Sequence, residues 1–257
     1  MLVDSHCHLD LLDLQQYGGT LQSVLDFARE SGVTHMLCVA VSLETYPRMR
    51  ALVDPLPQVS VSVGLHPNET VSQEPDIDTL ATLAADPRVV AVGETGLDYY
   101  RSDGDLEWQR ERFRRHIAAA RRVGKPVIVH SRAARADTLR ILREEAVGDV
   151  GGVMHCFAED WETARGALDL NLHISFSGIV TFKNAIPLKE VARQVPLDRM
   201  LVETDCPYLA PVPFRGRPNQ PGYVRHVAEH IAELRGVSLT TIAESTTRNF
   251  QRLIGRP

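Results

Sequence analysis

Short apolar runs alternate with longer amphipathic segments along this chain, and this alternation constrains its fold more than any other feature. Eight runs have the length and composition of buried strands: residues 2–3, 33–41, 59–63, 89–92, 127–129, 152–154, 173–176 and 200–202. Helical spacing of apolar residues marks segments between them: residues 21–30, 80–85, 107–122, 138–145, 163–168 and 186–195. The pattern predicts parallel strands joined by helices.

A closed barrel is favoured over an open sheet, because eight strand and helix units in 257 residues match the usual size of that barrel. No composition shift or flexible linker divides the sequence, so residues 1–257 are expected to form one domain. Segments 224–234 and 239–253 are expected to be the last barrel helix and a terminal packing helix. The predicted fold class is α/β, a (β/α)8 TIM barrel with a C-terminal packing helix.

Composition limits the compartment and the partners. With 28 basic and 33 acidic residues the net charge is −5, so a polyanionic substrate must be held by local charge or by metal. There is no apolar stretch long enough to cross a bilayer and no secretory signal pattern, which predicts a cytoplasmic chain without membrane association. The four cysteines form no Cys-x-x-Cys pair, which favours reduced, mostly buried thiols: Cys7, Cys38, Cys156 and Cys206.

Metal-binding side chains stand at the ends of five predicted strands. A lone histidine at such a place is usually a packing or hydrogen-bonding residue, but this set meets at one face, because TIM-barrel active sites lie at the carboxyl ends of the strands. The first two histidines are two residues apart and so share a strand face. The set comprises His6 and His8 after the first strand, Glu94 after the fourth, His130 after the fifth, His155 after the sixth and Asp205 after the eighth.

These ligands exceed what one four-coordinate centre with an open position needs, so two divalent ions are expected, drawn from Zn, Mn, Mg, Ni or Co. Glu94 would bridge the two ions. One ion would be held by His6, His8 and Asp205, and the other by His130 and His155. Paired ions activate a bridging water and clamp the attacking and leaving oxygens, which predicts hydrolysis by metal-bound hydroxide.

Asp205 and Glu203 share one face of the eighth strand, with Asp205 nearer its open end. Asp205 is expected to bind metal and to accept the proton of the attacking water, so we assign catalytic roles to Asp205 and Glu94. Glu203 is expected to hold a ligand in place or to contact metal directly; a buried carboxylate paired with Arg or Lys is the alternative. His66, after the third strand, is either a substrate contact or a structural hydrogen-bonding residue.

The loop after the eighth strand carries Arg215 and Arg217 between prolines. Guanidinium groups bind phosphate in a bidentate manner, and the loop follows a strand that carries a predicted ligand. We therefore expect both arginines to contact substrate, although an exposed Arg-Gly-Arg loop is usually ordinary surface.

Several motifs, in order along nearly the whole chain, resemble the TatD family of metal-dependent deoxyribonucleases within the amidohydrolase-like barrels. They are LVDSHCHLD (2–10), GLHP (64–67), GETGLDY (93–99), VHS (129–131), HCF (155–157), ETDCPYL (203–209) and RGRPN (215–219). The resemblance implies the same six metal ligands and an exonuclease acting on single-stranded or frayed DNA ends. DNA is thus the expected substrate, and a monomer is compatible with it.

Two other functions compete with nuclease activity. The acidic net charge and lack of an extended basic surface favour a metal-dependent hydrolase of a small ester, amide or phosphoester. Glu94 tilts against amidohydrolases that bridge their metals with a carbamylated lysine, because it needs no modification. A metal-binding scaffold without turnover is the third hypothesis, and an open two-metal mouth flanked by arginines argues against it.

Overall fold

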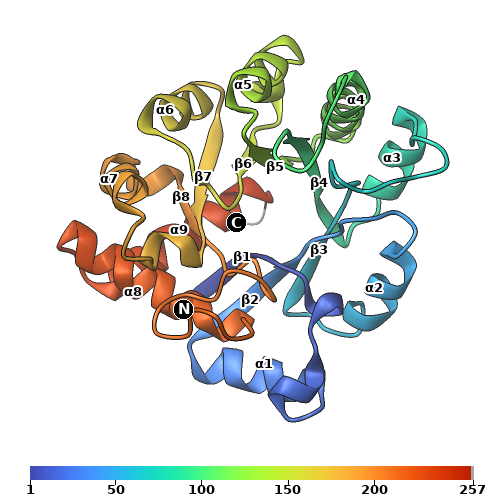
Figure 1. Ribbon diagram of the computed structural model, residues 1–257. Coiled ribbons are helices and arrows are strands. Elements are labelled where there is room, and N and C mark those ends of the chain that lie inside the picture. The colour runs from blue at the N-terminus through green and yellow to red at the C-terminus, as the bar shows by residue number, and fades with distance from the viewer. Residues whose placement is uncertain (256–257) are drawn as a thin grey trace.

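Eight parallel strands pair in sequence order in the computed structural model, which describes residues 1–255. Their bounds are β1 (Leu2–Cys7), β2 (Val33–Cys38), β3 (Val59–Val63), β4 (Val89–Asp98), β5 (Val127–Arg132), β6 (Gly152–Met154), β7 (Leu172–Phe176) and β8 (Met200–Val202). Helices surround this central sheet (Figure 1), which confirms the predicted TIM barrel.

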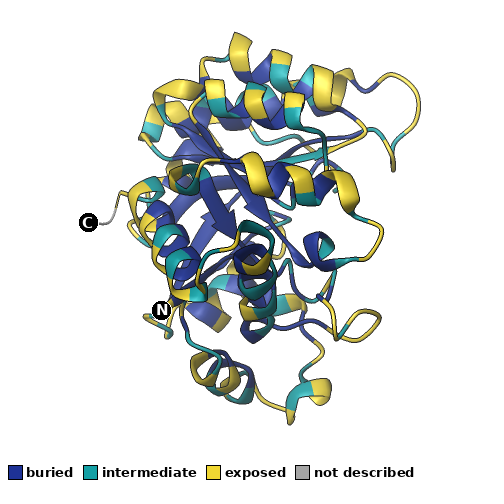
Figure 2. Ribbon diagram, turned by 90° about the vertical axis from the view of Figure 1, so that its left-hand side faces the viewer, coloured by how far each residue is buried: buried dark blue, intermediate teal, exposed yellow. Residues whose placement is uncertain are grey.

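The surrounding helices are α1 (Leu21–Glu30), α2 (Tyr46–Val53), α3 (Ile77–Ala84), α4 (Glu107–Val123), α5 (Arg135–Glu144), α6 (Trp161–Asp169), α7 (Ile186–Gln194) and α8 (Val224–Arg235). Figure 2 shows buried strands inside and helices whose outer faces are exposed. Helix α2 was not among the predicted helices; it is short, and its Pro47 lies in the first turn, where proline is tolerated. Within residues 1–255, no helix combines the length and apolarity that a membrane span requires.

β4 and β5 run further than predicted, so Glu94 and His130 lie within strands rather than after them. Pairing continues from Thr95 with Val129 to Asp98 with Arg132. Gly96 permits it, because a Cβ there would lie 2.0 Å from the carbonyl oxygen of His130. The close approach of the two backbones brings the side chains of β4 and β5 together.

The barrel closes at a seam between β1 and the segment after β8. No strand ladder joins β8 to β1 among the described residues, but Asp205 N–H donates to His6 O at 3.0 Å and His8 N–H donates to Cys206 O at 2.9 Å. The Asp4 carboxylate accepts from the Thr204 N–H at 2.8 Å and its hydroxyl at 2.6 Å. The seam therefore fixes the backbone on which His6, His8 and Asp205 stand.

The predicted terminal packing helix is α9 (Leu239–Leu253), which covers the amino-terminal end of the barrel. Phe250 is buried and packs with apolar side chains from inside the barrel, among them Val3, Ile128 and Leu201. Asn249 Nδ2 also donates to the carbonyl oxygens of Leu197 and Met200, at 2.7 and 2.9 Å. Because α9 covers the amino-terminal end of the barrel, a functional site is expected at the carboxyl ends of the strands, as in other TIM barrels.

Replacing Phe250 with alanine should lower the free energy of unfolding by about 3–5 kcal/mol, because it removes a buried ring from the barrel floor. Urea denaturation measures the change. Arg248→Ala, an exposed position on the same helix, is the control and should stay within about 0.5 kcal/mol of the parent. Equal losses of unfolding free energy in the two variants would show that Phe250 of α9 does not stabilise the end of the barrel.

Candidate metal centre

The six predicted ligands meet around Glu94, a buried residue of β4 whose two carboxylate oxygens face different histidine pairs. Glu94 Oε2 lies 3.4 Å from His6 Nε2 and 4.0 Å from His8 Nε2. Glu94 Oε1 lies 3.0 Å from His130 Nδ1 and 2.8 Å from His155 Nε2. Bridging of two ions by Glu94 stays a prediction, and this placement of its two oxygens is compatible with it.

The first half of the cluster contains His6, His8 and Asp205. The two histidine Nε2 atoms are 3.3 Å apart, and Asp205 Oδ1 lies 3.7 Å from His6 Nε2 and 3.5 Å from His8 Nε2. His8 Nδ1 donates to Val39 O at 2.9 Å, so its Nε2 lone pair is free to face the cluster. Asp205 has a left-handed backbone, with φ of 57°, at the point where the chain leaves β8.

The second half contains His130 and His155, each supported by a carboxylate behind it. Asp98 Oδ2 lies 3.2 Å from His130 Nε2, and Glu203 Oε1 lies 3.3 Å from His155 Nδ1. A proton on each outer nitrogen would leave His130 Nδ1 and His155 Nε2 as the ligand atoms facing Glu94. Glu203 thus lies where an orienting residue is needed, and the Cys156 N–H also donates to it at 2.6 Å.

Asp98 was not identified from the sequence. It is 1% exposed and accepts hydrogen bonds from Asn68 Nδ2 at 2.8 Å and from the N–H groups of Tyr100 and Arg101 at 3.0 Å each. The signal was available in the spacing, because Glu94 and Asp98 are four residues apart and so share a strand face. Asp98 was missed because the predicted strand ended at residue 92, whereas β4 continues to Asp98.

His66 lies beside the second half but has a different hydrogen-bonding pattern. Its Nδ1 accepts the N–H of Asn68 at 3.1 Å, and its Nε2 lies 3.4 Å from Glu94 Oε1. Burial lowers the pKa of His66 to about 4, so the ring is neutral near pH 7 with its proton on Nε2. In this tautomer His66 presents an N–H donor to the cluster, and one of its ring nitrogens also lies within 4.8 Å of possible ligand atoms of Glu94 and His130.

The charges within the cluster favour an anionic Glu94. Burial acts to raise the pKa of Glu94, but the charge of His155 and hydrogen bonds from His130 and His155 hold it well below its ordinary range. Burial acts to lower the pKa of His155, yet Glu94 and Glu203 raise it well above the ordinary value of 6.5. Without a cation, the cluster therefore compensates its carboxylates with histidine protons.

The donor set fits divalent cations. Imidazole nitrogens and carboxylate oxygens suit Zn, Mn, Ni or Co, and the atoms of His6, His8 and Asp205 all lie within 4.8 Å of one another. Three buried polar atoms of the cluster have no hydrogen-bond partner among the described residues: His6 Nδ1, His155 Nδ1 and Glu203 Oε2. A cation can replace the histidine protons without any large rearrangement of these side chains.

The cluster is reachable from one edge. The side chains of His66, His130 and Asp205 are 15%, 17% and 13% exposed, whereas those of the remaining four predicted ligands are at most 4% exposed. Arg215 and Arg217 are exposed on the loop after β8. The guanidinium carbon of Arg215 lies 4.3 Å from the centre of the Phe182 ring. No ion pair joins either arginine to the cluster within the described residues, so their contact with substrate stays a prediction.

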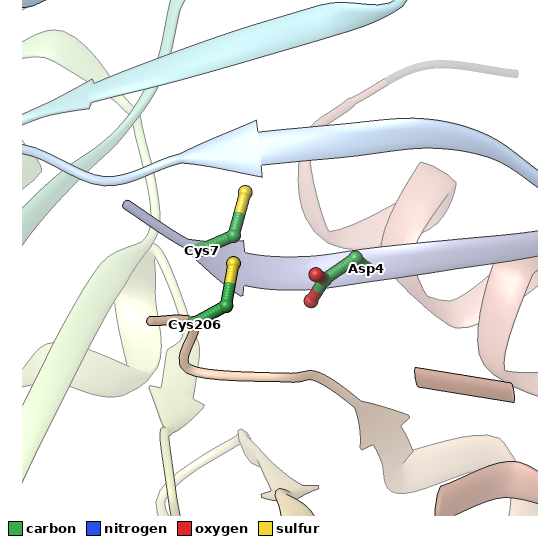
Figure 3. A group of neighbouring side chains, drawn as sticks. All are labelled: Asp4, Cys7 and Cys206. Carbon is green, nitrogen blue, oxygen red and sulfur yellow. The ribbon is translucent and has the colours of Figure 1, made fainter. Parts of the chain in front are cut away.

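A second group of metal-binding residue types, Asp4, Cys7 and Cys206, lies at the barrel seam (Figure 3). All three are fully buried, and their ligand atoms lie within 4.8 Å of one another. However, both Asp4 oxygens already accept from Thr204, and Cys7 Sγ donates to Leu37 O at 3.3 Å. Figure 3 shows the two sulfur atoms side by side and the Asp4 carboxylate apart from them. We assign this group to closure of the barrel.

Divalent-cation affinity should rise with pH, because binding displaces the proton that Glu94 and Glu203 hold on His155. The rise should continue above pH 6.5, approach about tenfold per pH unit for each proton released, and level off once His155 is deprotonated. Titration calorimetry with Mn²⁺ measures it. Glu203→Gln should move the plateau to lower pH, and an affinity independent of pH would contradict the assignment.

Asp98→Asn should weaken cation binding about 10- to 100-fold, because His130 loses the carboxylate that orients its ring. The same calorimetric titration measures the loss. Asp105→Asn is the matched control, since Asp105 is an exposed carboxylate on the loop after β4. Equal affinities in the two variants would remove Asp98 from the site.

Comparisons with known proteins find similarity along nearly the whole chain. A family model described as TatD related DNase matches residues 3–255. YcfH of Escherichia coli K12, named an uncharacterized metal-dependent hydrolase, is 54% identical over 253 residues, covering 98% of this chain and 95% of its own. The 3′-5′ ssDNA/RNA exonuclease TatD of Klebsiella pneumoniae is 30% identical and covers 95% of each chain.

A solved structure has the same fold. YJJV, a TatD homolog from Escherichia coli K12, superposes with a TM-score of 0.90 and 28% identity, covering 100% of this chain and 98% of that chain. The match of the family model over nearly all described residues leads to one conclusion. The chain belongs to the TatD family and is a metal-dependent hydrolase.

Proposed function

We propose that this hydrolase is a deoxyribonuclease that removes nucleotides from single-stranded or frayed DNA ends. The observation that carries the proposal is the placement of Glu94, whose two oxygens face His6 with His8 on one side and His130 with His155 on the other. A site for two neighbouring cations suits phosphodiester cleavage, because both the attacking and the leaving oxygen need stabilisation. The name of the Klebsiella pneumoniae relative supports a nucleic-acid substrate.

The side chains divide the work of hydrolysis. Two divalent ions, when bound, supply an acidified water and stabilise charge on the phosphate oxygens. Asp205 accepts a proton from the water: burial acts to raise its pKa, but the hydrogen bond from His8 and the charges of His6 and His155 lower it. His66 donates its Nε2–H to a phosphate oxygen, since that proton lies at the open edge of the cluster.

Substrate would reach the cluster past the loop that carries Arg215 and Arg217. Both arginines are exposed and unpaired among the described residues, so their donors are available to backbone phosphates. This local charge is needed because the net charge of the chain is −5. The proposal places the enzyme in the cytoplasm, in keeping with four free cysteines.

A small ester, amide or phosphoester is the alternative substrate, and the acidic net charge is the observation that favours it. Such an enzyme would use the same metal ligands, and a small ester or amide would gain nothing from the guanidinium groups of Arg215 and Arg217. Both functions would require metal, so only the identity of the substrate distinguishes them.

Metal-loaded enzyme should shorten end-labelled single-stranded DNA, and Asp205→Asn should lower kcat about 10²- to 10⁴-fold through loss of the proton acceptor. Gel analysis with Mg, Mn, Co, Ni and Zn in turn measures the shortening. Asp198→Asn, in the exposed turn before β8, is the control and should retain full activity. Turnover of bis(p-nitrophenyl) phosphate without any shortening of DNA would sink the proposal in favour of the small-molecule alternative.

A further inference from the structure

We propose that Arg132 and Tyr100 form a subsite that holds one phosphate and one base of single-stranded nucleic acid beside His130. Neither residue was among the predicted site residues, and the inference rests on the nuclease function proposed above. It names the place where the strand is held next to the second half of the metal cluster.

The register of β5 places Arg132 over the open edge of the cluster. His130 and Arg132 are two residues apart in this strand, so their side chains leave from the same face. Arg132 is the last residue of β5 and is exposed, whereas His130 below it is 17% exposed. A chain lying across the carboxyl end of β5 would meet Arg132 and His130 in succession.

The ring of Tyr100 packs against the guanidinium group of Arg132. The Arg132 guanidinium carbon lies 4.0 Å from the centre of the Tyr100 ring, a cation–π contact. Tyr100 is 69% exposed, so much of its side chain is open to a ligand. The pair thus presents a planar cation and an aromatic surface at the same point.

The subsite is tied to the metal centre through Asp98. Asp98 Oδ1 accepts the N–H groups of Tyr100 and Arg101, while Asp98 Oδ2 lies 3.2 Å from His130 Nε2. Tyr99 N–H also donates to Arg132 O at 2.9 Å. One buried carboxylate therefore positions both a metal ligand and the loop that carries the aromatic ring.

The guanidinium of Arg132 is available to a ligand. It makes no ion pair with any described residue, whereas Arg110, on the neighbouring helix α4, pairs with Asp105 and Glu107. Stacking on Tyr100 restrains the side chain without consuming its donors, so a phosphate can accept from it. Any of the four bases can stack on an exposed aromatic ring, so such a subsite binds single strands whatever their sequence.

A similar pair lies across the barrel. Arg215 stacks on Phe182, and these residues lie on the loops after β8 and β7. Tyr208, 55% exposed, has its ring centre 6.3 Å from that of His8. Stacked guanidiniums and exposed rings thus stand on two sides of the cluster, which favours an extended strand over a compact substrate.

Binding of a phosphorothioate-linked single-stranded oligonucleotide, which resists hydrolysis, tests the subsite on the metal-loaded enzyme. Fluorescence anisotropy over a series of salt concentrations gives the dissociation constant and its salt dependence. Arg132→Leu should weaken binding at least about fivefold and reduce the slope of log K against log salt by about 0.7, the value for one lost phosphate contact. Arg132→Lys should keep the slope, because it keeps the charge.

Tyr100→Leu should weaken binding about fivefold or more with an unchanged slope, since it removes stacking and no charge. The matched controls are Arg165→Leu and Phe27→Leu, exposed positions on α6 and α1, which should bind as the parent does. If Arg132→Leu binds like Arg165→Leu, or the parent chain does not bind the oligonucleotide, the subsite is refuted.

Cleavage of the same sequence with ordinary phosphodiester linkages separates the two proposals. A parent chain that binds with the expected variant pattern but does not cleave would support the subsite and refute the nuclease function. A parent chain that cleaves, with variants that bind normally, would refute the subsite alone.

Discussion

Glu94 carries a negative charge at the centre of a barrel whose wall and floor keep water away from it. A buried carboxylate is costly unless cations or donors surround it, and here the donors arrive in two sets, one facing each oxygen. The histidine protons that compensate Glu94 in the metal-free chain are those that divalent cations would displace. The same constraint thus governs the charge of the cluster and its affinity for metal.

The barrel supplies this arrangement by bringing distant segments to one end. The seam hydrogen bonds between β1 and the segment after β8 join residues about 200 positions apart, and the Asp4 contact with Thr204 lies beside them. The glycine at position 96 lets β4 approach β5, which brings Glu94 next to His130. With α9 covering the opposite end, chemistry is confined to the face where the loops meet.

The fold could be predicted from apolar periodicity, and strand-end position predicted the six side chains that meet at the cluster. His6, Glu94 and Asp205 are conspicuous polar residues that end or follow apolar runs. Asp98, Tyr100 and Arg132 were not predicted as site residues, because their placement depends on how far β4 and β5 continue beyond their apolar cores. That length is set by interstrand pairing, which a single sequence does not reveal. The donor role of His66 depends on a backbone contact from Asn68, equally invisible before folding.

Anomalous diffraction from crystals of the Mn²⁺-loaded protein tests the bridging role of Glu94 most directly. The account predicts two peaks per chain, one among His6, His8 and Asp205 and one beside His130 and His155, with a different Glu94 oxygen on each ion. Glu94→Gln should lose at least one of the peaks while keeping the barrel intact. A single peak at the Asp4, Cys7 and Cys206 group, or two peaks with Glu94 bound to neither, would contradict it.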